Sequence, residues 1–386
     1  MEPDSLLFSF FLIFSGAALA STLALFFRQP LLVAYIFIGG LLGPFGVGYI
    51  SNSSLLTDIA EFGIIFLLFL LGLDMQPSKL FHTLKKTFLV TLASSIIFIL
   101  LGYSTGLLFS FSHVESLVIG FAMIFSSTII GIKLLPTTVL HQKHMGELMV
   151  GILLLQDFIA IFLLVFLDSG NIEQSSALRV LLAFPLLLAI AYFATRFILI
   201  KLVARFDQFK EYIFLLAIGW CLGLAALASA MGLSAEIGAF IAGVSLATSP
   251  ISLFIALNLK PLRDFFLILF FFSLGAQFNT ALLGQVIAPA LLLAALALSV
   301  KPVVFHFLLR RFSEKSILAW DAGLRLGQIS EFSLLIAFVA TQSGMIGETA
   351  SLVIQAAAIM TFLVSSYIVV MFCPTPIASN PKLRRD

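Results

Sequence analysis

The chain has 386 residues, a formal net charge of +2 and a hydrophobic fraction of 61%, and only 10% of its residues are charged. A water-soluble domain carries roughly 25% charged residues, and the 42 phenylalanines here exceed what a soluble surface can hide. This composition excludes a soluble enzyme, a nucleic-acid-binding protein, a disordered chain and a disulfide scaffold. It predicts an all-α polytopic membrane protein.

Thirteen apolar stretches follow one another along the chain, separated by proline, glycine and charged residues. A helix crosses the hydrocarbon core in about 20 residues. The predicted spans are 5–27, 30–50, 55–74, 87–111, 114–139, 146–167, 178–204, 211–230, 232–249, 261–279, 283–309, 317–341 and 346–372. The basic residues lie mostly in alternate connections, so the positive-inside rule predicts an external N-terminus and a cytoplasmic C-terminus.

An internal repeat is visible in the second and ninth spans. The segment Phe37–Gly40 recurs as Phe240–Gly243, 203 positions later. The same offset aligns Glu61 with Asp264, Gly72 with Gly275, Gly120 with Gly323 and Ser127 with Ser330. Chance matches among common apolar residues are the alternative. Because the offset passes seven spans, an odd number, the two copies are expected to have opposite orientations. The pattern predicts two six-helix inverted repeats, 1–168 and 211–373, with a linker helix in 169–210 and a cytoplasmic tail at 374–386.

Few charged residues fall inside the predicted spans, and each is a functional candidate because burying a charge in hydrocarbon costs several kcal/mol. Asp157 lies halfway along the sixth span, preceded by Gln156, with no basic residue within a helical turn. Such a carboxylate binds a cation, takes up a proton, or holds helices together as a neutral acid. Competition between the first two is what a proton-coupled cation carrier requires.

Polar clusters occupy the middle of two further spans at equivalent positions of the repeat. Ser126, Ser127 and Thr128 lie in the fifth span, and Gly327–Glu331 lies in the twelfth. Ser, Thr and Gly weaken helices, so we expect a pair of broken helices whose dipoles point into the site, with Glu331 supplying negative charge. Small-residue packing between unbroken helices is the alternative.

Other charged residues have two interpretations each. Lys301 in the eleventh span is expected either to pair with Asp157 or to snorkel to the cytoplasmic face. Lys133, Arg325 and Asp321 lie on the predicted cytoplasmic side of the breaks, as dipole compensators, vestibule charges or snorkelling side chains. The sequence contains no recognisable nucleophile–base pair or phosphate loop, so we expect no enzyme activity, no cofactor and no resident metal.

Seven short segments, spread over nearly the whole chain, form an ordered set that is specific although each one alone is a weak signal. They are 30–44, 59–74, 126–128, 156–157, 232–243, 261–266 and 327–332. In this set the chain resembles the monovalent cation:proton antiporter superfamily, and within it the membrane domain of Kef-type potassium/proton antiporters.

The resemblance implies a homodimer with a dimerisation scaffold (spans 1–3 and 8–10) and a mobile core (spans 4–6 and 11–13) that contains two crossed broken helices. It matches Asp157 to the cation- and proton-binding aspartate, Lys301 to the lysine opposite it and Glu331 to an acid at the crossing. It also implies a bacterial inner membrane location, and a nucleotide-binding regulatory domain or regulatory subunit outside this chain. Gln156, where sodium/proton members carry Asn or a second acid, favours potassium.

We therefore expect potassium/proton antiport by alternating access. Asp157 would bind a cation or a proton, with oxygen ligands from Gln156, Ser126, Ser127 and Thr128. The expected partners are K⁺ or Na⁺, protons, the lipid bilayer and a second copy of the chain. Sodium/proton antiport on the same scaffold is the alternative. A gated potassium channel is less favoured, because inverted repeats suit a carrier and the sequence has no TVGYG-like filter; a non-transporting sensor is a third reading.

Overall fold

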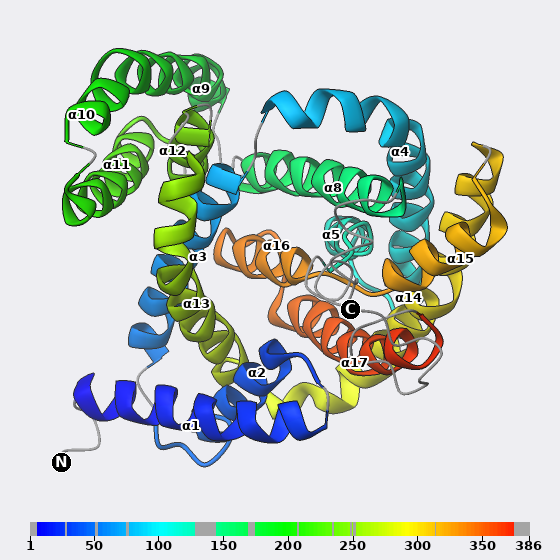
Figure 1. Cartoon of the computed structure of the whole chain (residues 1–386). Coiled ribbons are helices and arrows are strands. Elements are labelled where there is room, and N and C mark those ends of the chain that lie inside the picture. Colours follow the sequence, from blue (N-terminus) through cyan, green and yellow to red (C-terminus); the bar gives the residue numbers. More distant parts are fainter. Residues whose placement is uncertain are drawn as a thin grey trace. The chain divides into compact units, whose positions relative to one another are not determined.

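The computed structural model is all-helical wherever it describes secondary structure (Figure 1). It describes residues 6–27, 29–50, 53–74, 77–127, 144–168, 174–206, 208–233, 235–247, 249, 252–312 and 314–373. The helices are α1 (Leu6–Phe26), α2 (Leu31–Leu42), α3 (Ser53–Asp74), α4 (Pro77–Leu108), α5 (His113–Ala122), α8 (His144–Asp168), α9 (Gln174–Ala194), the π-helix η2 (Thr195–Leu199), α10 (Ile200–Arg205), α11 (Lys210–Ala230), α12 (Ala235–Ala247), α13 (Ser252–Ala276), the 3-10 helix η3 (Thr280–Leu282), α14 (Leu283–Arg311), α15 (Ser316–Arg325), α16 (Glu331–Gln342) and α17 (Glu348–Phe372).

Most helices begin and end within a few residues of the predicted spans, but α2, α4 and α13 differ; α13 begins at Ser252, nine residues before its predicted span. The predicted second span continues to residue 50, whereas α2 ends at Leu42. Pro44 accounts for this end, since the residue before a proline is disfavoured in the helical conformation. Conversely, α4 begins ten residues before the predicted span, at Pro77, because the polar segment 77–86 continues the helix beyond its apolar part.

Six helical segments of the described residues are long and apolar enough to cross a membrane. They are Leu7–Phe26, Thr87–Leu108, Ala183–Arg205, Lys210–Ala230, Thr280–Arg311 and Glu348–Phe372. Several shorter apolar helices accompany them, among them α2, α5, α12 and α16. The chain is thus an all-helical integral membrane protein, while thirteen crossings and their orientation stay predictions.

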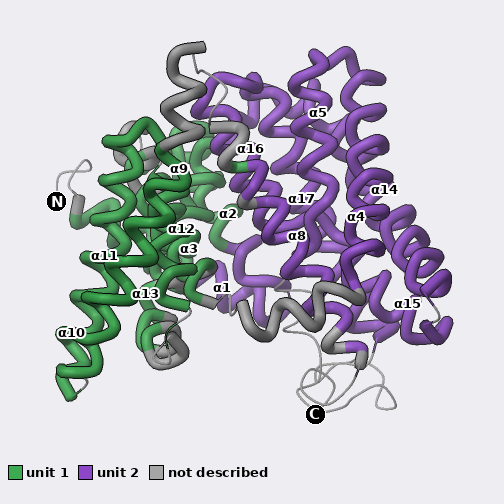
Figure 2. The backbone as a smooth tube through the Cα atoms, turned by 90° about the horizontal axis from the view of Figure 1, so that it is seen from above, with its two compact units in different colours: residues 1–17, 35–80, 164–277 green, residues 18–34, 81–163, 278–386 purple. Residues whose placement is uncertain are grey.

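The chain forms two compact units, each built from separate stretches of sequence (Figure 2). Unit 1 comprises Met1–Ala17, Tyr35–Leu80 and Leu164–Gln277; unit 2 comprises Ala18–Ala34, Phe81–Leu163 and Phe278–Asp386. Each unit draws on both halves of the chain, so neither coincides with one predicted repeat. Unit 2 contains the spans that the resemblance assigns to the core.

Within unit 1, glycines let pairs of helices approach backbone to backbone. Gly243 of α12 lies against Gly72 of α3, and Gly275 of α13 lies against Gly40 of α2. A Cβ at Gly72 would lie 3.1 Å from the Cα of Gly243, and one at Gly40 would lie 3.4 Å from the Gly275 carbonyl oxygen. Gly72 and Gly275 are 203 positions apart, and so are Gly40 and Gly243. The two contacts are therefore equivalent in the repeat.

Unit 2 contains a second pair of equivalent contacts. A Cβ at Gly120 of α5 would lie 2.6 Å from the carbonyl oxygen of Ile99 in α4. A Cβ at Gly323 of α15 would lie 2.6 Å from the carbonyl oxygen of Pro302 in α14. Gly120 and Gly323 are 203 positions apart, and so are Ile99 and Pro302. The half-helices α5 and α15 therefore pack on α4 and α14 in the same way.

We predict that Gly120→Ala lowers the thermal unfolding midpoint of the purified protein. The added methyl group meets backbone atoms that cannot rotate away, and overpacking of this kind costs about 1–3 kcal/mol. Gly219→Ala in α11 is the matched control, because a Cβ there meets nothing within 4 Å. Equal midpoints for the two variants would show that the α4–α5 contact is not tight.

Candidate functional site

Helical structure stops at two places in unit 2, and we call these two places the interruptions. The half-helix α5 ends at Ala122 and is followed by non-helical residues 123–127. Between α15 and α16 the non-helical residues are 326–330, which confirms the interruption predicted in the twelfth span. Ser330 caps α16 by accepting a hydrogen bond from the amide of Phe332, since a serine side chain replaces the missing helical partner there.

Lys301 of α14 bridges the two interruptions. Its side chain is 0% exposed, and its ammonium group donates hydrogen bonds of 2.9 Å to the carbonyl oxygens of Phe125 and Gln328. These two acceptors are themselves related by the 203-residue offset. Each carbonyl lies just beyond the C-terminal end of a half-helix, where the helix dipole is negative. One positive charge therefore compensates both ends.

Of the two interpretations of Lys301, snorkelling is wrong, because its ammonium group is fully buried between the interruptions. The part of the chain that the structure describes also contains no ion pair between Lys301 and Asp157. The ammonium group instead lies 5.1 Å from the ring centroid of Phe98, the residue 203 positions before it. An aromatic face at this distance stabilises a cation.

Gln156 of α8 also forms hydrogen bonds to the backbone of the first interruption, residues 123–127. Its side chain is 1% exposed; its Oε1 accepts a hydrogen bond of 3.0 Å from the amide of Ser126, and its Nε2 donates one of 3.0 Å to the carbonyl of Ile124. The side-chain amide thus replaces the backbone partners that a continuous helix would have provided. The oxygen predicted to be a cation ligand is engaged in this contact.

The second interruption is held by Gln328 and by two side chains of α17. Gln328 donates from Nε2 to the carbonyls of Arg325 and Ser127, at 2.8 and 3.3 Å. Ser365 donates to Gln328 Oε1, and Thr361 accepts a hydrogen bond from the amide of Ile329. Sequence reasoning missed Thr361 and Ser365. Their spacing of four residues places both on one face of α17 and was the available signal.

Two serine hydroxyls join the interruptions directly. Ser126 donates a hydrogen bond of 2.8 Å to the carbonyl of Leu326, and Ser333 donates one of 2.7 Å to the carbonyl of Ala122. Unpaired polar backbone groups are costly away from water, and these bonds satisfy them at the points where helical bonding stops. The non-helical segments are thus fixed to each other.

Asp157 follows Gln156 on α8, so the contacts of Gln156 also fix its position. Its side chain is only 5% exposed. No residue within the described ranges donates a hydrogen bond to the Asp157 carboxylate or forms an ion pair with it. Glu331, at the start of α16, acts on it electrostatically. A buried carboxylate near a second acid, without a fixed counter-charge, attracts a proton or a metal cation.

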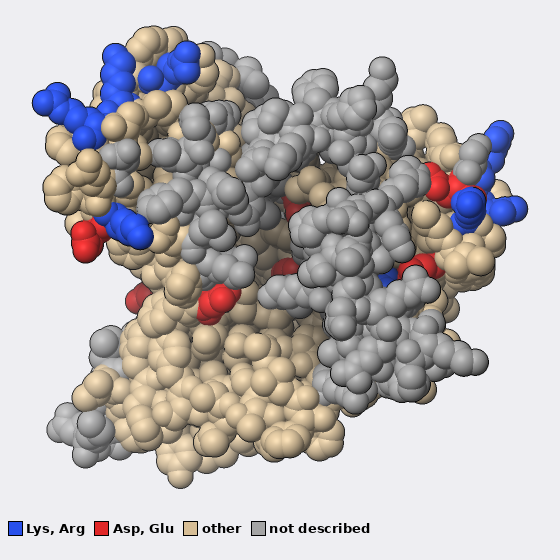
Figure 3. Space-filling view, viewed as in Figure 1, with Lys and Arg blue, Asp and Glu red and all other residues tan. Residues whose placement is uncertain are grey.

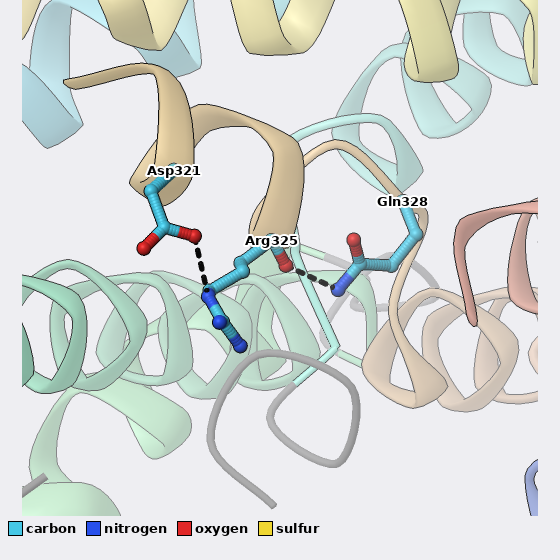
Figure 4. A network of polar contacts seen from close by, with 3 residues as sticks. All are labelled: Asp321, Arg325 and Gln328. Atoms are coloured by element: carbon cyan, nitrogen blue, oxygen red, sulfur yellow. Dashed lines mark hydrogen bonds and ion pairs between the residues drawn. The ribbon is translucent and has the colours of Figure 1, made fainter. Parts of the chain in front are cut away.

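Arg325 is paired with an acid in its own helix (Figure 4). Its side chain is 0% exposed, and Nε lies 2.9 Å from Oδ1 of Asp321, whose side chain is 17% exposed. The guanidinium group lies in the last turn of α15, where a cation stabilises the helix dipole. Ser127 is fully buried beside this network. Thr128 and Lys133, the two other predicted site residues, lie outside the described residues.

Paired helix interruptions beside a buried carboxylate are typical of secondary transporters. A family model described as "Sodium/hydrogen exchanger, transmembrane" matches residues 12–373. The chain belongs to this family, which makes it a monovalent cation:proton antiporter by descent.

Relatives and solved structures agree with this membership. The chain is 28% identical to "Iron transporter MagA" of Paramagnetospirillum magneticum, over 88% of this chain and 79% of the relative. It is 28% identical to "K(+) efflux antiporter 5" of Arabidopsis thaliana, over 80% of this chain but only 56% of the relative. The sodium proton antiporter MjNhaP1 of Methanocaldococcus jannaschii has the same fold, with a TM-score of 0.68 at 18% identity, covering 93% of this chain and 94% of MjNhaP1.

We predict that Lys301→Met destabilises the protein by about 2–6 kcal/mol, since it leaves two buried carbonyls unsatisfied at about 1–3 kcal/mol each. Lys301→Arg keeps the charge and should lose less. Unfolding of the purified protein is the measurement, and Lys210→Met, which removes an exposed lysine at the start of α11, is the control. If Lys301→Met and Lys210→Met unfold alike, Lys301 does not hold the interruptions.

Proposed function

We propose that this protein exchanges potassium ions for protons across the membrane, with Asp157 as the site for which the two compete. The observation that carries the proposal is the contrast between Asp157 and its neighbours. Gln156, Lys301 and Gln328 are all engaged in hydrogen bonds, whereas the Asp157 carboxylate has no hydrogen-bond or ion-pair partner among the described residues. A bound proton or cation would supply the partner that this carboxylate lacks.

The ligands of the cation are oxygen atoms around this carboxylate. Ser126 uses its hydroxyl hydrogen in the bond to Leu326, which leaves the lone pairs of its oxygen for a cation. Ser127 and Thr128 follow it in the chain and are proposed as further ligands. A monovalent cation on Asp157 gives a locally neutral site, and so does a proton. Both loaded forms therefore avoid a net charge at membrane depth.

Lys301 keeps its charge throughout the proposed cycle. Its ammonium group compensates the ends of α5 and α15 through the bonds to Phe125 and Gln328. Removing its proton would leave two dipole ends uncompensated. With Asp157 as the titrating carboxylate and Lys301 as a constant charge, one proton is exchanged for one monovalent cation, and the exchange is electroneutral.

Alternating access follows from the proposed inverted repeats. The equivalent glycine contacts within each unit, and the equivalent carbonyls bound by Lys301, support two repeats, 1–168 and 211–373. We propose thirteen crossings with the N-terminus outside, unit 2 as the moving part that carries Asp157, and unit 1 as the scaffold of a homodimer. An inverted repeat provides outward- and inward-facing forms of similar free energy, because exchanging the two conformations interconverts them.

The proposed preference for potassium depends on Gln156 and on relatives that are named K(+) efflux antiporters. The chain spans little more than half of those plant relatives. Sodium is the alternative ion, on the scaffold shared with MjNhaP1. The name of MagA makes iron a further ion to test.

We predict that vesicles containing the purified protein release protons when cation is added, and that Asp157→Asn abolishes this flux by removing the carboxylate for which both ions compete. Proton flux should be titrated with K⁺, Na⁺, Rb⁺ and Fe²⁺. Half-maximal flux at a lower concentration of K⁺ than of Na⁺ supports the proposed preference. The reverse order establishes the sodium alternative.

The matched control for this measurement is Asp58→Asn. It makes the same chemical change at an exposed carboxylate of α3 in unit 1, and its flux should equal that of the unchanged protein. Full cation-dependent flux in Asp157→Asn would contradict the assignment of the site. Cation flux without proton movement, at rates far above those of carriers, would favour a channel instead.

A further inference from the structure

A row of exposed basic side chains runs along the end of the α9–η2–α10 segment in unit 1. Arg196, Lys201 and Arg205 are all exposed, and none of the three forms an ion pair with a described residue. Lys and Arg side chains gather over the region of α10 in Figure 3. We call Arg196, Lys201 and Arg205 the basic row.

The π-helix η2 brings the basic row into line. Residues Thr195–Leu199 are π-helical, and the amide of Ile200 donates to the carbonyl of Thr195, an i→i+5 bond. In such a turn, residue i+5 rather than i+4 lies above residue i. Lys201 therefore lies above Arg196, and Arg205 follows Lys201 at the ordinary α-helical spacing of four.

Side-chain hydrogen bonds within unit 1 anchor the π-helix. Thr195 is buried and donates a hydrogen bond of 3.0 Å to the hydroxyl of Ser245 in α12. Trp220 of α11 donates to the same hydroxyl at 3.1 Å, and Ser245 itself donates to the carbonyl of Ala242. The Ser245 hydroxyl thus accepts two hydrogen bonds and donates one, which is its full capacity. Thr195, the first residue of η2, therefore has a fixed position. The alignment of the basic row is built into the packing.

The row lies where lipid headgroups are expected. The continuous helical segment Gln174–Arg205 is about 48 Å long, against about 30 Å for the hydrocarbon core, so its end extends into the headgroup region. Exposed apolar side chains lie beside the cations: Phe193, Phe197, Ile198, Phe206 and Phe209. Arg205 lies over the ring of Phe206, 5.9 Å from its centroid. This segment thus presents apolar side chains to lipid acyl chains and basic side chains to a phosphate group.

We propose that the basic row binds the phosphate headgroup of an anionic phospholipid from the surrounding leaflet. Charge complementarity favours an anion, and the flanking aromatic side chains favour a lipid over free phosphate. The site depends on the alignment of three cations, so it is distinct from the general excess of basic residues at a cytoplasmic face.

A second basic segment of the chain provides a comparison. In unit 2, Arg310 and Arg311 end α14 and Lys315 precedes α15, with Glu314 between them in sequence. Figure 3 shows red acidic atoms among the blue basic ones in the region of α14 and α15. Diffuse attraction of anionic lipid would involve both segments alike, whereas a built site involves only the row.

The test measures binding of fluorescent phosphatidylglycerol to the full chain in phosphatidylcholine nanodiscs. Arg196→Gln, Lys201→Gln and Arg205→Gln should each weaken binding about fivefold, the effect of one basic residue near an anionic surface. The decisive variant exchanges neighbours, Arg196→Phe with Phe197→Arg. It keeps composition and net charge but moves one cation off the row, and it should weaken binding as much as Arg196→Gln.

Two controls complete the measurement. Arg310→Gln removes a cation outside the row and should leave binding unchanged, and millimolar inorganic phosphate should not displace the lipid. Wild-type binding by the exchange variant, or equal weakening by Arg310→Gln, would overturn the proposal in favour of diffuse attraction. Displacement by inorganic phosphate would overturn it in favour of a free-anion site. If the exchange variant does not fold, Arg196→Gln against Arg310→Gln decides the question.

Discussion

The site depends on one buried ammonium group that satisfies two helix ends at once. A helix interrupted in a membrane leaves carbonyls that water cannot reach, and here two interruptions occur close together. Lys301 donates to Phe125 and Gln328, the equivalent carbonyls of the two copies. Because one positive charge serves both ends, the interruptions must stay together, and Gln156 and Gln328 can then fix the remaining backbone groups.

This arrangement separates two roles among buried polar groups. The structural groups Gln156, Lys301 and Gln328 all form hydrogen bonds, as buried polar groups generally do. The Asp157 carboxylate has no such partner among the described residues, and it follows Gln156, whose amide oxygen and nitrogen both form hydrogen bonds. A carboxylate on a rigid support can exchange its bound ion without reorganising the site. Such preorganisation suits a carrier that must bind a proton and a cation alternately.

Much of the architecture could be predicted from the sequence, because a lipid environment leaves few choices. Apolar runs indicated the helices, and the 203-residue offset predicted that Ser126–Thr128 and Gly327–Glu331 are equivalent interruptions. The contacts of Lys301 could not be predicted, since sequence gives its depth but not the direction of its side chain. The roles of Thr361 and Ser365 were missed because hydroxyls in a membrane helix usually bond to their own backbone.

The central proposal is that Lys301 is a constant structural charge while Asp157 alone exchanges ions. It is tested most directly by recording current from proteoliposomes on a solid-supported membrane during a potassium jump, with internal pH followed in parallel. The expected result is a potassium-dependent pH change with no transported charge, since one proton leaves for each cation that enters. A sustained current that accompanies the pH change would contradict it, because a second titrating group would then have to take part.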